Sequence, residues 1–281
     1  MKIAVYYHDD VIVNKGSASE FVRTLCEELS HHFIVALFAY GDTNESRIVR
    51  MNGYAYHVIK RNKFQRFLSK GQLSKKVINA AIAHLPLLYL QSKIFGPDVV
   101  ICVDPFAGLS TMALAKRDGV PVVYRPNDSL SLLAKQLKQT GNLSVAILVT
   151  LYAAVAANLI ASKADLILPS SNLVKEYKNS KVQSLVLPYC PPRVQSRNLQ
   201  ANSQSEVRRS LGLPSDKKIL LFLGTGDWEP NRRAIDYIIR TLAPQFMDSI
   251  PDVLFLIVGQ HTEAYRSAGN PTNVIIVGGG R

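Results

Sequence analysis

Apolar runs of strand length alternate along the chain with segments whose apolar residues fall at helical spacing. Residues 3–7 and 33–40 are runs of the first kind, residues 55–59 and 97–103 are similar segments that contain His57 and Asp98, and residues 20–29 carry apolar side chains on one helical face. Uninterrupted apolar runs are typical of strands that are buried on both faces of a parallel sheet. The alternation of such strands with helices predicts an α/β fold built from βαβ units.

The clearest βαβ unit lies in the last third of the chain. An apolar run at residues 219–223 ends in the glycine turn 224–226, a helical pattern follows at residues 234–242, and a second apolar run occupies residues 253–258. Ligands of open parallel sheets bind at the carboxyl ends of the strands. The loop at residues 224–231 is therefore the first candidate binding site.

A glycine turn before a helix N-terminus suits a phosphate group. Such a turn offers backbone N–H groups, and the helix dipole adds a positive end. The loop does not complete the dinucleotide fingerprint, because Glu229 stands at the third glycine position, and the chain contains no P-loop motif. The alternative is that Gly224 and Gly226 only turn the chain.

Three strings in this region resemble a known family. LLFLGTGDWEPNRRAIDYIIRTLAPQF, PDVLFLIVGQ and NVIIVGG occur in this order, and they look like the C-terminal domain of family-four-type glycosyltransferases of the GT-B architecture. The resemblance implies two Rossmann-like parallel-sheet domains that face a cleft, the second of them incomplete. It places an acceptor-side domain at residues 1–195, a linker and lead-in helix at 196–216, and a partial nucleotide-sugar donor domain at 217–281.

The same resemblance implies an activity. The family transfers a sugar from a nucleotide-diphosphate donor to a glycan or lipid-linked acceptor, with retention at the anomeric carbon and without a metal or other cofactor. In the family the first glycine-containing loop of the N-terminal domain also faces the donor. The residues implied in donor and phosphate binding are Gly16, Ser17, Gly224, Thr225, Gly226, Asp227, Asn231, Arg232 and Arg233.

Two strand ends of the first domain carry polar residues that would face the cleft. Asp104 follows one apolar run, and Arg125, Asn127 and Asp128 follow the next. The family holds the sugar or the acceptor at the second of these positions. The resemblance therefore implies that Asp128 or Asp104 positions the acceptor. Arg232 or Arg233 lies close to the positions where the family has basic residues and is the candidate to neutralise the departing diphosphate; the alternative is a basic, solvated first turn of the helix. For Asn127 and Asp128, a capped turn before the next helix is the alternative.

The chain departs from the family pattern in its second domain. The family's E-x7-E signature, which holds the donor ribose and sugar, is absent from that domain, and Thr225 and Pro230 or Asn231 stand where an arginine and a lysine are usual. These departures leave open a catalytically inactive remnant that acts as a binding or interaction protein. We therefore expect weak, salt-sensitive nucleotide binding and little or no turnover.

Charge and cysteine content narrow the choice of partners and compartment. The chain has 33 basic and 21 acidic residues, a net charge of +12, which favours an anionic partner. No nucleic-acid recognition motif accompanies this charge, so a nucleic acid is not expected. The three isolated cysteines and the absence of metal-ligand spacing predict a reduced, cytoplasmic interior without a metal site.

Two segments suggest contact with a membrane. Residues 60–76 interleave basic residues with Phe64 and Phe67, which is typical either of a helix lying on an anionic membrane or of a packed surface helix. Residues 139–162 contain no charge; their length permits a membrane span, but a buried or membrane-touching helix is favoured. The protein is thus expected to be cytoplasmic, or peripheral on the inner face of the cytoplasmic membrane.

Overall fold

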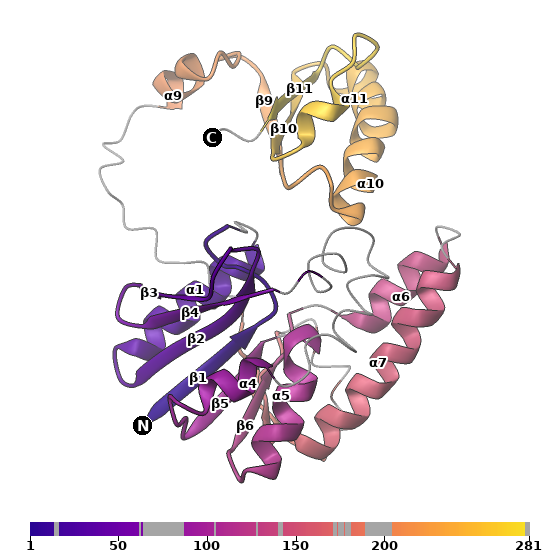
Figure 1. Cartoon of the computed structure of the whole chain (residues 1–281). Coiled ribbons are helices and arrows are strands. Elements are labelled where there is room, and N and C mark those ends of the chain that lie inside the picture. Colours follow the sequence, from indigo (N-terminus) through magenta and orange to yellow (C-terminus); the bar gives the residue numbers. More distant parts are fainter. Residues whose placement is uncertain are drawn as a thin grey trace. The chain divides into compact units, whose positions relative to one another are not determined.

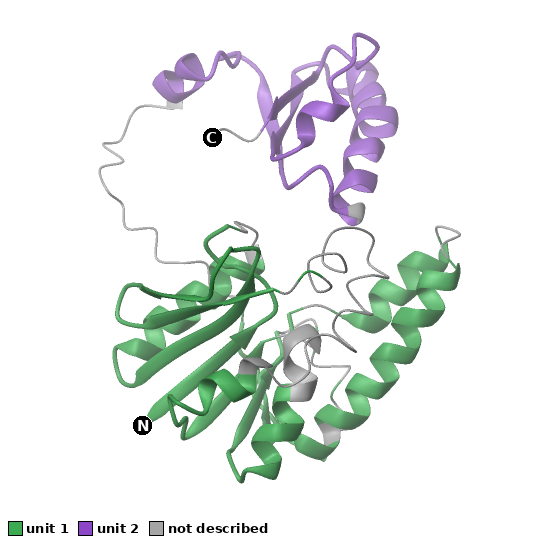
Figure 2. Ribbon diagram, in the orientation of Figure 1, with its two compact units in different colours: residues 1–195 green, residues 196–281 purple. Residues whose placement is uncertain are grey.

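The computed structural model divides the chain into two compact units, residues 1–195 and 196–281 (Figure 2). The residues that the structure describes are 1–13, 17–61, 63, 87–103, 105–127, 129–139, 143–170, 173, 177, 181–188 and 204–278.

The described part of unit 1 contains an eight-stranded sheet (Figure 1). Its strand order is β3-β4-β2-β1-β5-β6-β7-β8, and every neighbouring pair is parallel except β3 and β4. The strands are β1 (Lys2–Tyr7), β2 (Ile34–Gly41), β3 (Arg47–Arg50), β4 (Ala55–Lys60), β5 (Val99–Val103), β6 (Val122–Arg125), β7 (Leu166–Ile167) and β8 (Gln183–Ser184). The predicted parallel α/β fold is confirmed.

Helices cover both faces of this sheet because its central strands are apolar on both sides. Phe21, on α1, packs with Val5 and Leu37 on one face, and Met112, on α5, packs with Tyr6 and other residues on the opposite face. The helices described in unit 1 are α1 (Ser17–Ser30), α4 (Leu87–Ser92), α5 (Pro105–Arg117), α6 (Leu130–Gln139) and α7 (Leu143–Lys163). Unit 1 therefore has the three layers expected of a parallel sheet.

Helix α7 corresponds to the uncharged segment of the sequence. Among the described residues it is the one helix long and apolar enough to cross a membrane, with a mean hydropathy of 2.2 over Leu143–Ile160 and 28% of that window buried. Its inner face, with Val149 and Ile160, belongs to the core of unit 1. The structure therefore has the expected packed helix, with an exposed outer face.

Unit 2 has a three-stranded parallel sheet in the order β11-β10-β9. One face of this sheet packs against a helical segment that runs without a break from Glu229 to Ser249. Its middle part is a π-helix, in which the Ala243 amide donates to Ile238 O, five residues earlier. Pro244 follows directly and has no N–H to donate to the carbonyl four residues earlier, which favours this irregularity. The elements are α9 (Gln204–Ser210), β9 (Lys218–Leu223), α10 (Glu229–Tyr237), η3 (Ile238–Leu242), α11 (Ala243–Ser249), β10 (Val253–Gly259), η4 (Thr262–Tyr265) and β11 (Val274–Gly278).

Two details differ from the sequence-based expectation. The apolar residues 185–187 predict a last strand of unit 1 at residues 185–188, whereas β8 is Gln183–Ser184, where it pairs with β7. The amides of Leu185 and Leu187 continue this pairing beyond β8 by donating to Ile167 O and Pro169 O, both at 3.0 Å. Strand β3 is an antiparallel edge strand that no pattern indicated. The basic segment at residues 60–76 lies outside the described residues, apart from residues 60, 61 and 63.

The second face of the unit 2 sheet carries exposed aliphatic side chains. Leu221 and Leu223 project from β9 on the face opposite Phe222, which packs against the helix, and both are exposed within the described chain. We expect Leu221→Thr/Leu223→Thr to reduce self-association, because an exposed apolar edge strand promotes pairing with other chains. The unfolding free energy should change by less than about 1 kcal/mol, since both sites are exposed.

Light scattering and denaturant titration measure these two quantities. Ile257→Ala is the matched control, because Ile257 is fully buried under the helix and its truncation should cost about 2–4 kcal/mol. Unchanged self-association of the double variant would show that this face is not the adhesive surface.

Candidate functional site

The parallel strands of unit 1 bring a set of polar residues to one edge of the sheet. Strands β1, β2 and β4 are mutually parallel in the order β1-β2-β4, so their carboxyl ends lie together (Figure 1). The residues that follow these ends are His8, Asp9, Asp10, Asp42 and Arg61. This edge is where ligands of open parallel sheets bind.

Arg61 connects two of these loops. Its Nη2 donates to His8 O at 2.9 Å and to Asp9 Oδ1 at 3.0 Å, and its Nη1 lies 3.5 Å from Asp42 Oδ1. The guanidinium is almost fully buried, whereas the two carboxylates are partly exposed. A buried arginine between two carboxylates orients both, so Asp9 and Asp42 present fixed acceptor oxygens toward solvent.

Asp10 has a different role because it is buried. Its Oδ1 accepts hydrogen bonds from the Tyr56 hydroxyl and from the Ile12 amide, both at 2.9 Å. Burial, and next the Asp10 carboxylate, raises the pKa of Tyr56, so this phenol stays a donor. Gly41 lies so close that a Cβ there would meet Asp10 Oδ2 at 2.9 Å. Asp10 Oδ1 therefore fixes the loop after β1, whereas Asp10 Oδ2 is buried without a hydrogen-bond partner among the described residues.

Arg125 is the most buried charged residue of the predicted site. Its side chain is 1% exposed at the end of β6, with Cζ 4.6 Å from the centre of the Phe21 ring and Nη1 donating to Pro126 O. Burial lowers the pKa of this guanidinium. Within the described residues, neither Arg125 Nε nor the Asn127 amide nitrogen has a hydrogen-bond partner. A buried guanidinium requires an anion nearby, and a ligand anion could supply it.

Several predicted site residues cannot be placed. Gly16, Asp104 and Asp128 lie outside the described residues, and Ser17 begins α1 with an undescribed side chain. Among the residues that are described, no three His, Cys, Asp or Glu side chains gather as a metal ion would need.

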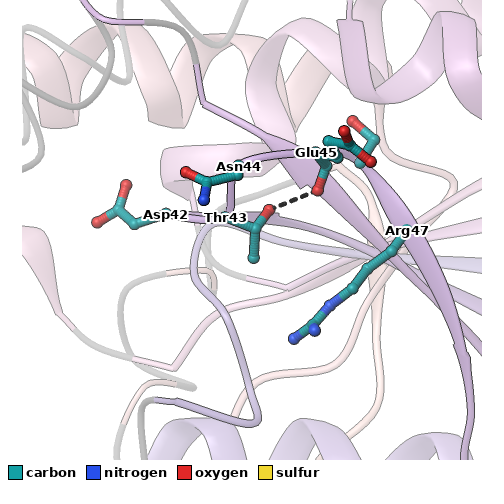
Figure 3. Close-up of a pocket in the computed structure, with 6 residues that line it drawn as sticks. Asp42, Thr43, Asn44, Glu45 and Arg47 are labelled. Carbon is teal, nitrogen blue, oxygen red and sulfur yellow. Dashed lines mark hydrogen bonds between the residues drawn. The ribbon is translucent and has the colours of Figure 1, made fainter.

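A hollow of about 460 Å³ lies beside the same edge, and Figure 3 shows it. It is formed by the loop from Asp42 to Arg47, where the Thr43 hydroxyl donates to Glu45 O at 2.8 Å. Most of these side chains are exposed. The hollow is thus an open loop surface. The oriented charged groups lie at its rim, where Asp42 pairs with Arg61.

In unit 2 the glycine loop packs tightly against the loop after β10. A Cβ on Gly226 would lie 2.4 Å from His261 O. Gly259 adopts a φ of +153°, and a Cβ there would lie 1.9 Å from Gly224 O. Larger residues cannot occupy these positions without moving backbone. The glycines therefore permit two strand-end loops to pack on each other.

This packing corrects one expectation for the phosphate site. The amides of Gly224 and Gly226 donate to Val258 O at 3.0 Å and to Gln260 O at 2.7 Å. Their N–H groups are already paired, so they cannot form the phosphate cradle that the sequence suggested. A phosphate at this loop would need the first turn of α10 instead.

The remaining predicted donor-side residues surround that turn. Asn231 lies in the first turn of α10 and donates from Nδ2 to Thr225 O at 3.0 Å, which ties the loop to the helix. The Thr225 hydroxyl donates to Asp227 Oδ1. Arg232 and Arg233 are exposed in the same turn. This part of unit 2 thus brings two guanidinium groups to a helix N-terminus.

The sequence reasoning missed Asp9, Asp42 and Arg61 as candidate site residues. Asp9 and Arg61 are 52 positions apart, and only the strand order β1-β2-β4 brings them together. The sequence did contain a usable signal, because each of these residues follows the carboxyl end of an apolar run. Ligands of parallel sheets bind at such strand ends.

Comparisons with known proteins identify the architecture. No protein-family model and no curated protein sequence matches the chain. Solved structures do: sucrose-phosphate synthase from Thermosynechococcus elongatus (TM-score 0.63, 18% identity, 99% of this chain and 70% of that one) and trehalose-6-phosphate synthase OtsA (0.62, 9%, 99% and 74%). Anabaena HepE in complex with UDP-glucose is also similar (0.55, 16%, 100% and 70%). The fold is therefore that of the GT-B class, as the sequence predicted.

The ion-pair cluster generates a prediction about stability. We expect Arg61→Met to lower the unfolding free energy by about 1–3 kcal/mol, because it leaves Asp9 and Asp42 without their shared cation and removes a buried hydrogen bond. Lys60→Met is the control, since Lys60 is exposed and should change the value by less than about 0.5 kcal/mol. Urea unfolding measures both variants, and equal stabilities would show that the cluster does not hold the two loops.

Proposed function

We propose that the chain is a glycosyltransferase that moves a sugar from a nucleotide-diphosphate donor to a glycan or lipid-linked acceptor. The observation that carries the proposal is the GT-B fold, whose similar structures include sucrose-phosphate synthase and a HepE complex with UDP-glucose. Polar groups at the carboxyl edge of each sheet support it, because this is where such a fold binds its substrates.

The acceptor belongs at the edge of unit 1. Asp9 and Asp42 offer carboxylate oxygens that Arg61 holds in place, and carboxylates accept hydrogen bonds from sugar hydroxyls. Arg125 and Asn127 contribute buried donors near the end of β6, which suit an anionic or hydroxyl-rich group. Asp104 and Asp128, the residues proposed to position the acceptor, follow the ends of β5 and β6 in the sequence.

The donor diphosphate belongs at the first turn of α10 in unit 2. Arg232 and Arg233 add positive charge to the helix N-terminus, and both features stabilise charge that develops on a departing diphosphate. We propose that the transfer retains the anomeric configuration and requires no metal. These residues bind and neutralise the leaving group, while the unit 1 residues orient the acceptor hydroxyl.

One specific observation favours a second candidate, a non-catalytic binding protein on the same scaffold. The amides of Gly224 and Gly226 are paired within the protein, and Asn231 holds the loop where the family usually has a basic residue. A loop without these phosphate contacts would still bind nucleotide weakly through the remaining positive charge of the helix N-terminus. Assay of transfer from radiolabelled sugar nucleotides to a mixed acceptor pool separates the two candidates, because the binding protein gives no product.

The donor site predicts a specific loss of affinity. We expect Arg232→Ala/Arg233→Ala to weaken UDP-glucose binding by roughly tenfold, since charge-assisted contacts to phosphate are lost. Arg240→Ala is the control, because Arg240 is an exposed arginine that lies 3.9 Å from Asp236 further along the same helical segment. Isothermal titration at low and high salt measures the affinities. Equal losses in the two variants would mean that the first turn of α10 is not the phosphate site.

A further inference from the structure

Helix α7 exposes a continuous apolar stripe. Leu143, Ile147, Leu151 and Val155 follow one another at four-residue intervals and are 54%, 53%, 62% and 55% exposed. Residues four apart lie on the same side of a helix. The opposite side, including Val149, is packed into the core of unit 1. The outer side of α7 therefore contacts no other described part of this unit along most of its length.

The stripe projects beyond the carboxyl edge of the sheet. Helix α6 begins five residues after β6 ends, and α7 returns antiparallel to it and finishes three residues before β7 begins. With 21 residues, α7 is about 31 Å long, whereas the strands of this sheet reach at most about 26 Å and β6 only about 13 Å. The first half of α7 and its partner α6 thus extend past the strand ends, as Figure 1 shows.

The charge around the stripe has one sign. Residues 129–164 contain Lys135, Lys138 and Lys163 and no aspartate or glutamate. Lys135 and Lys138 are exposed on α6 beside the stripe-bearing helix, and the exposed Leu132 lies one turn before Lys135. An apolar stripe on a hairpin whose charged residues are all lysines is complementary to a surface with an anionic layer over an apolar interior.

We propose that the α6–α7 hairpin is a membrane-docking surface that inserts the stripe among the headgroups of an anionic lipid layer. The occupant is the bilayer rather than a second copy, because two copies would bring lysines together without an acidic partner. Helix α7 would lie on the membrane rather than cross it, because a membrane-spanning α7 would have to leave the core of unit 1, in which Val149 and Ile160 are packed. The inference does not depend on glycosyl transfer, but it would bring the acceptor edge of unit 1 to the membrane surface.

Vesicle co-sedimentation of the full chain tests this proposal. Wild-type protein is expected to bind vesicles of phosphatidylcholine and phosphatidylglycerol better than vesicles of phosphatidylcholine alone. Ile147→Glu/Leu151→Glu should weaken binding by roughly tenfold or more, because two apolar side chains that would insert into the lipid layer become charged. Lys135→Gln/Lys138→Gln should weaken only the phosphatidylglycerol-dependent part, by roughly fivefold for each lysine.

A matched control carries the same chemical change elsewhere on unit 1. Ile48 and Ile94 are exposed isoleucines outside the hairpin, and Ile48→Glu/Ile94→Glu should bind vesicles as wild type does. Circular dichroism establishes that each variant is folded. Alkaline carbonate should release the wild-type protein from the vesicles, as expected of a docked protein.

Four results would overturn the proposal. The first is a wild-type chain that does not bind vesicles, and the second is equal binding by Ile147→Glu/Leu151→Glu, which would direct attention to residues 60–76. The third is retention after carbonate, which indicates a span. The fourth is a wild-type dimer that the stripe variant converts to a monomer without any vesicle binding, which would make a second copy the occupant.

Discussion

Parallel strand pairing is the constraint on which the rest of this protein depends. Each parallel connection must cross over the sheet, so helices cover its faces and all the parallel strands end at the same edge. The loops at that edge can carry polar groups without disturbing the core, and several of them lie side by side there. In unit 1 the loops after β1, β2 and β4 use this freedom to assemble Asp9, Asp42 and Arg61.

Two buried arginines provide the positive charge at the carboxyl edge of the unit 1 sheet. The two terminal nitrogens of Arg61 bind two carboxylates and a carbonyl, so this side chain supports the loops around it, while its Nε has no hydrogen-bond partner among the described residues. Arg125 is buried just as deeply, yet within the described residues it has only a carbonyl acceptor and an aromatic ring. One arginine therefore stabilises the site, and the other is available to an anion.

Sequence patterns predicted the fold well because burial on both faces leaves a strong signal. The runs that became β1, β2, β9 and β10 have few polar interruptions. The last strand of unit 1 was predicted two residues too late, because its pairing with β7 already begins at the polar residue Gln183 and the apolar residue Leu185 only continues it.

The site was harder to predict than the fold, for a physical reason. Sequence spacing indicated a glycine turn before α10, but it does not show that the carbonyls of Val258 and Gln260 take the glycine amides. The Asp9–Arg61 pair likewise depends on strand order rather than on any local motif. Contacts across strand ends follow from topology, so they emerge only with the fold.

In the proposed donor site, the strand-end loop and the first turn of α10 in unit 2 hold a nucleotide-diphosphate sugar. Hydrogen–deuterium exchange of the full chain, with and without UDP-glucose, tests this site. Bound ligand is expected to slow exchange in peptides that cover residues 224–233, with β10 unchanged because its amides are already paired in the sheet. Exchange at residues 224–233 that does not respond to a saturating ligand would exclude this site.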